Sequence, residues 1–146
     1  MLSGTWIANT NFQAQISETS WQEATDKIGD LNTVALLTFH INYYLEGINH
    51  VFAGGTLEIK DKFSFDMPEI NSEQEWQSLV ERFVENAKKF VNAVENLSHD
   101  MLDQPFTDAK YGSYQRNIEG VIEHSYYHLG QVVLIRKLVS ARLQKS

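Results

Sequence analysis

Residues 114–142 read YQRNIEGVIEHSYYHLGQVVLIRKLVSAR, and their apolar positions recur at spacings of three and four. Such spacing places apolar side chains on one face of an α-helix. The members of this face are Ile118, Val121, Ile122, Leu129, Val132, Val133, Ile135, Leu138 and Val139. Basic residues toward the end of the stretch, such as Arg136 and Arg142, complement the negative end of the helix dipole. The pattern predicts one long amphipathic helix that must pack against other helices.

Two further stretches show the same periodicity. The first begins after Asn32 or Thr33, either of which can cap a helix, and ends at Phe52 before Gly54-Gly55. The second opens with Ser72, followed three residues later by Glu75, which is the signature of a capping box, and it runs to Leu97. The apolar faces are Val34, Leu37, Ile41, Leu45 and Ile48 in the first, and Trp76, Leu79, Val80, Phe83, Ala87, Phe90, Val91 and Val94 in the second.

A fourth helix is predicted at the start of the chain, from about Leu2 to Thr19, continuing through Trp21 and Ala24 to a break at Gly29-Asp30. Its apolar stripe is looser than the others. Residues 56–71 and 98–112 form two long connections, and no stretch predicts a sheet. We therefore expect a single all-α domain over residues 1–146, a four-helix bundle with long connections, large enough to bury its own core.

Charge and composition exclude several classes of function. Twelve Lys and Arg stand against nineteen Asp and Glu, a net charge of −7, which disfavours binding to nucleic acid or to anionic lipid. The chain has no cysteine, so thiolate zinc sites, iron–sulfur clusters and cysteine nucleophiles are excluded. A metal ion would need histidine or carboxylate ligands.

Neither a secretion signal nor a membrane-spanning segment is evident in the sequence. The first residues, MLSGTW, lack a basic region followed by an apolar run. No stretch reaches the roughly 20 apolar residues that a transmembrane helix needs. We expect a cytoplasmic protein that does not bind membranes.

His124 and His128 are spaced by four residues, which puts their side chains on neighbouring turns of one helix face, about 5–6 Å apart at the β-carbons. They continue the rows set by Val121 and Val132, so both should point into the bundle. Two imidazoles on an apolar face need partners for their nitrogen atoms. A shared metal ion, with bonds of about 2.0–2.1 Å, or hydrogen bonds to protein groups could supply them.

His40 raises the case for a metal, because it lies on the same face as Leu37, Ile41 and Tyr44 of the second predicted helix. Three inward imidazoles from two helices would form an open facial site, with positions left for water or substrate. His50 follows ten residues later, about 80° away around the helix, and His99 lies in a connection; neither is expected to be a ligand.

The carboxylates do not complete a known metal motif. Glu123 precedes His124 directly, which is not the His-Glu-x-x-His order, and Glu119 with Glu123 is best interpreted as a solvated helix face. The Glu-x-x-His pairs of di-iron bundles are absent, which disfavours a dinuclear oxidase. Tyr126 and Tyr127 are expected to pack against adjacent helices, although one hydroxyl could reach a bound substrate.

Several motifs resemble the DinB-like (DinB/YfiT) superfamily of four-helix-bundle metalloenzymes. The most specific is IEHSYYHLGQ at residues 122–131, and LLTFHI at residues 36–41 is similar to the family's second-helix motif. SHDML at residues 98–102 resembles the segment that often precedes the final helix. The resemblance covers nearly the whole chain.

The resemblance implies one divalent metal ion, zinc or nickel, bound by His40, His124 and His128, and a homodimer. It also implies a thiol-dependent S-transferase activity, in which the metal activates a low-molecular-weight thiol that serves as cosubstrate. Cations lower the pKa of a bound thiol or water, and a chain without cysteine would need an external thiol.

Two other interpretations stay open. A metal-dependent hydrolase or isomerase would use metal-bound water as its nucleophile. A non-catalytic metal-binding stress-response module would use the histidines for structure alone. The substrate in either enzyme case is a small molecule whose identity the residues do not specify.

Overall fold

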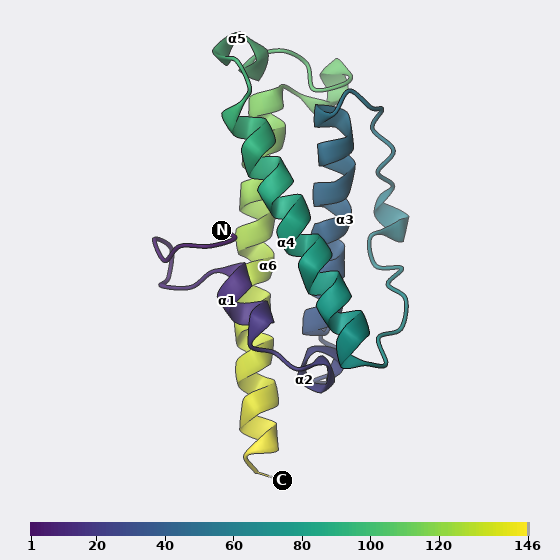
Figure 1. The fold of residues 1–146 in the computed structure, drawn as a ribbon, viewed down its shortest axis with the longest axis vertical. Coiled ribbons are helices and arrows are strands. Elements are labelled where there is room, and N and C mark those ends of the chain that lie inside the picture. The colour runs from purple at the N-terminus through teal and green to yellow at the C-terminus, as the bar shows by residue number, and fades with distance from the viewer. Residues whose placement is uncertain (146) are drawn as a thin grey trace.

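The computed structural model describes residues 1–145, and this part of the chain is helical without any strand (Figure 1). The elements are α1 (Phe12–Ser17), α2 (Trp21–Thr25), α3 (Val34–Phe52), α4 (Glu73–Glu95), α5 (His99–Leu102) and α6 (Tyr114–Leu143), with 3₁₀ turns η1 (Asp61–Phe63) and η2 (Ala109–Tyr111). The predicted all-α class and its three long helices are confirmed. Within residues 1–145, no helix combines the length and apolar character needed to cross a membrane.

The long helices α3 and α4 run in the same direction, and α6 runs antiparallel to both (Figure 1). Two parallel neighbours cannot be joined by a short turn, so residues 53–72 return along the outside of the bundle; we call this segment the crossover. Buried amides hold the parallel pair together. Asn86 donates to the Asn42 side chain at 2.9 Å, and Asn49 donates to the Asn86 carbonyl at 2.8 Å.

The predicted continuous first helix is wrong. Residues up to Asn11 are not helical, and Ala8 and Asn9 have φ angles of 54° and 52°, which no right-handed helix contains. Asn11 then caps α1, and Ser20 forms a capping box with Glu23 that starts α2 in a new direction. Two short helices therefore occupy the place of one.

Side-chain contacts fix these short helices to the bundle. The buried Trp76 of α4 donates its indole N–H to the Thr19 carbonyl at 2.7 Å, and the Phe12 and Phe83 rings lie 5.2 Å apart. Ser72 caps α4 as expected, but its capping box is incomplete, because the Glu75 carboxylate accepts from the N–H of Asn71 at 2.7 Å instead of from Ser72.

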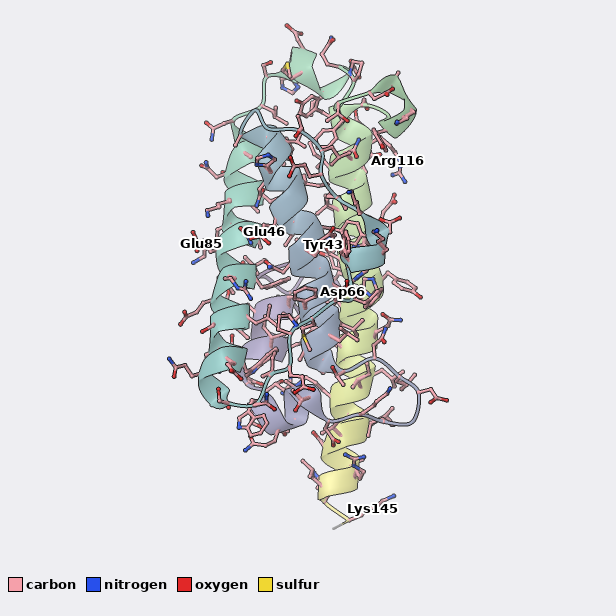
Figure 2. The ribbon with its side chains drawn as sticks, turned by 90° about the vertical axis from the view of Figure 1, so that its right-hand side faces the viewer. Tyr43, Glu46, Asp66, Glu85, Arg116 and Lys145 are labelled. Carbon is pink, nitrogen blue, oxygen red and sulfur yellow. The ribbon has the colours of Figure 1, made fainter. Side chains whose placement is uncertain are left out.

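The crossover is held against α3 by close packing at a glycine. A Cβ atom at Gly47 would lie 2.2 Å from a side-chain carbon of Ile59, so only glycine lets the crossover approach this closely. Next to it, Tyr43 donates its hydroxyl proton to the Lys60 carbonyl at 3.1 Å and accepts from the Lys60 N–H at 3.0 Å. Figure 2 shows the crossover passing in front of α3 and α6, with Tyr43 and Asp66 labelled.

This packing predicts that Gly47→Ala destabilises the protein by about 1–2 kcal/mol, because Ile59 must move. In an Ile59→Ala background the same change should instead stabilise by about 0.5–1 kcal/mol, the usual helix gain. Gly130→Ala, where a Cβ has open space, is the matched control and should stabilise in both backgrounds. Urea denaturation measures all of these variants, and a stabilised Gly47→Ala in the native background would contradict the packing.

Candidate metal centre

The structure brings the three predicted histidines together between α3 and α6. The Nε2 atom of His124 lies 3.1 Å from Nε2 of His40 and 3.0 Å from Nε2 of His128, and the candidate ligand atoms of all three lie within 4.8 Å of one another. His40 and His128 are 5% and 6% exposed, whereas His124 is half-buried. The phase of the two helices, as predicted, points all three rings inward.

The other ring nitrogen of two of these histidines is held by a protein acceptor. His40 Nδ1 lies 3.2 Å from the Ser64 carbonyl oxygen, and His128 Nδ1 lies 2.6 Å from Oε1 of Gln131. An acceptor at Nδ1 places the proton there, so the Nε2 atom of each ring keeps its lone pair. Both lone pairs therefore face His124.

Hydrogen bonding among the histidines alone cannot satisfy this arrangement. A proton on His124 Nε2 makes one good hydrogen bond, to His40 or to His128, and leaves the second close nitrogen pair repulsive. Adjacent ligands on an ion with bonds of about 2.0–2.1 Å lie about 2.9 Å apart at right angles and about 3.3 Å apart at the tetrahedral angle. The separations of His124 from His40 and from His128 fall in that range, which is compatible with a divalent cation bound beside His124.

Burial keeps the three imidazoles in the neutral form that binds metal. Burial, followed by the nearby His128 and His40, lowers the pKa of His124 from 6.5 to about 4. Burial also lowers the pKa of His40, where the neighbouring His128 adds to the effect, and the pKa of His128, where the bond to Gln131 opposes it. Few protons would have to leave at neutral pH when a metal binds.

Each histidine also contacts an aromatic ring. Phe65 of the crossover stacks on His40 with ring centroids 4.0 Å apart, the edge of Tyr44 meets His124 at 5.1 Å, and Tyr127 meets His128 at 5.0 Å. The Tyr44 hydroxyl donates to Asp61 Oδ1 at 2.8 Å. Burial and this hydrogen bond raise the pKa of Tyr44, so its hydroxyl stays protonated.

The residues that were not expected to be metal ligands lie away from the three histidines. His50 and His99 are exposed, and Glu123 is exposed in an ion pair with Arg116 at 3.1 Å. The Tyr126 hydroxyl accepts from the Met1 amino group at 3.0 Å, and Tyr126 lines a separate groove whose lining includes none of the three histidines.

The sequence did not lead us to predict the two groups that accept hydrogen bonds from the histidines. Gln131 follows His128 by three residues on the same helix, a spacing that could have indicated the contact. The Ser64 carbonyl belongs to the main chain of the crossover, where no side-chain pattern marks it.

Comparison with known families agrees with this geometry. A sequence model described as the DinB superfamily matches residues 7–132, which include all three histidines. The chain belongs to the DinB superfamily. No curated protein and no solved structure matches it. Superfamily membership and the clustered histidines are together compatible with a metal-binding site, and the resemblance seen in residues 122–131 is confirmed at the level of the family.

The lowered pKa values predict that the metal-free protein loses stability as the pH falls from about 6.5 to about 4. In this window the unfolded chain protonates its histidines near 6.5 while the folded centre resists protonation, so the unfolded state binds more protons and stability rises with pH. Urea denaturation at several pH values, compared with His124→Gln, isolates the effect from the carboxylates. An equally steep dependence in the variant would show that His124 is not its source.

Proposed function

We propose that this chain is a divalent-metal-dependent enzyme whose metal is held by Nε2 of His40, His124 and His128. The single observation that carries the proposal is the convergence of these nitrogen atoms at 3.0–3.1 Å, with two of the rings turned by acceptors at Nδ1. Neutral imidazole suits zinc and nickel among the common divalent ions. Three protein ligands leave further positions open, which is typical of catalytic rather than structural sites.

The reaction we propose is a transfer that uses a low-molecular-weight thiol as cosubstrate. A bound divalent cation would supply Lewis acidity, which lowers the pKa of a thiol. The chain itself contains no cysteine, so the sulfur must come from a small molecule. Membership of the DinB superfamily supports this choice.

The protein groups around the centre orient and shield the ligands. The Ser64 carbonyl and the Gln131 amide set the direction of two rings, a role that commonly raises the basicity of a ligand. Phe65 covers one face of His40 and excludes water from it. The Tyr44 ring packs against the His124 ring, and its protonated hydroxyl donates a hydrogen bond to Asp61.

Metal titration tests the centre. Protein purified without a histidine tag should bind about one zinc or nickel ion per chain, and His40→Ala or His128→Ala should abolish binding. Gln131→Ala should weaken binding by about 10–100-fold, because the ring of His128 loses its orienting partner. The exposed His99→Ala is the matched control and should bind normally. Wild-type protein that takes up no metal by calorimetry or elemental analysis would overturn the proposal.

We also infer that the chain forms a homodimer, as its family resemblance implies, and acts on a small molecule rather than on nucleic acid. Tyr127, Leu134 and Leu138 lie within about 40° of one another on the outer face of α6. Their exposed fractions of 66%, 55% and 38% are high for large apolar side chains, and such patches mark interfaces.

Analytical ultracentrifugation tests the dimer. The double variant Leu134→Glu, Leu138→Glu should sediment as a monomer at concentrations where wild type is dimeric, because two charges would enter the interface. Leu143→Glu, at an exposed position on another side of the same helix, is the control and should stay dimeric. Monomeric wild-type protein at every concentration would exclude the homodimer.

A further inference from the structure

A cavity of about 400 Å³ adjoins the exposed side of the histidine cluster. His124 and Tyr44 line the cavity beside the cluster, and Ile48 and Val121 add apolar surface. Arg116 also lines the cavity and lies in the first turn of α6 (Figure 2). Cavities of this size hold small-molecule ligands. The side of the candidate centre at His124 therefore borders a space that a small substrate can fill.

Gly120 leaves this space open. It lies one helical turn before His124 and lines the cavity. A Cβ atom there would have no neighbour within 4 Å, so no packing contact requires glycine at this position. A glycine inside a helix also makes the helix less stable than alanine would. The lack of a side chain directly beside a candidate metal ligand is what a substrate would need.

Arg116 places a positive charge at the cavity. Among the cavity-lining residues that the structure describes, it is the one with a permanent charge, in a chain whose net charge is −7. Its guanidinium already pairs with two carboxylates of the same helix: Glu123 in two-pronged geometry, with N–O distances of 3.2 and 3.1 Å, and Glu119 at 3.7 Å. Both side chains of the pair with Glu123 are exposed, 58% and 64%, so the pair contributes little to stability and another carboxylate can displace it.

We propose that this cavity is the substrate site of the metal centre, and that the substrate carries a carboxylate that Arg116 binds while its other end lies against His124. The proposal rests on the metal-dependent function proposed above. It assigns Arg116 and Gly120 to substrate recognition. Glu123 then acts as an internal competitor that holds the guanidinium in place when no substrate is bound.

Calorimetry of the zinc-loaded protein with two thiols of similar length tests this assignment. The probes are 3-mercaptopropionate, which carries a carboxylate, and 3-mercaptopropan-1-ol, which is neutral. Wild type should bind the carboxylate probe more tightly. Arg116→Gln should weaken that probe about tenfold and leave the neutral probe unchanged, because a charge-assisted hydrogen bond is lost. Glu123→Gln should do the opposite and strengthen the carboxylate probe several-fold.

The cavity itself is tested by Gly120→Leu, whose side chain would fill it, against Gly130→Leu on the same helix, where an added Cβ also meets no neighbour within 4 Å. Both variants should bind zinc as wild type does, but Gly120→Leu should lose both probes. Zinc uptake with wild-type probe binding in Gly120→Leu would overturn the site alone. Equal affinity of wild type for the two probes would overturn the carboxylate assignment. A wild type that binds no zinc would overturn the proposed function as well.

Discussion

Three imidazole Nε2 atoms meet in the interior of this bundle, and the rest of the structure is arranged around that contact. Lone pairs at 3.0–3.1 Å repel unless a cation or a proton lies between them, and one proton on His124 can relieve only one of the two close pairs. A fold that relaxed freely would turn the rings apart. Here hydrogen bonds from Nδ1 of two rings to Ser64 and Gln131 oppose that rotation, and the arrangement is compatible with a bound cation.

The crossover links the topology of the bundle to this centre. Because α3 and α4 are parallel, the chain must return along the outside, and the return passes over the side of α3 that carries His40. Gly47 lets Ile59 pack closely, Tyr43 holds the main chain at Lys60, and the Ser64 carbonyl and the Phe65 ring then reach the histidine. A connection that topology requires thereby completes the surroundings of the candidate ligand.

Helical periodicity predicted the long helices and the convergence of the histidines, because a buried face repeats every three to four residues and carries His40 and His128 with it. It failed at the start of the chain. There the apolar stripe was already loose in the sequence, and the positive φ angles of Ala8 and Asn9 and the capping box at Ser20 divide the segment. The Ser64 carbonyl could not be predicted, because a main-chain acceptor in an irregular segment has no sequence signature.

The three histidines differ in burial, so one side of the candidate metal centre is more exposed than the others. His40 lies under Phe65, and both His40 and His128 are almost fully buried, whereas His124 is only partly buried and borders a cavity. Of the three histidines, His124 is the one that lines this cavity, together with Ile48 and Val121. Apolar surface beside His124 and a guanidinium farther out favour a ligand with an apolar middle and an anionic far end. Among the residues that the structure describes along this cavity, Arg116 is the one with a permanent charge, so it determines where the anionic end of a ligand would lie.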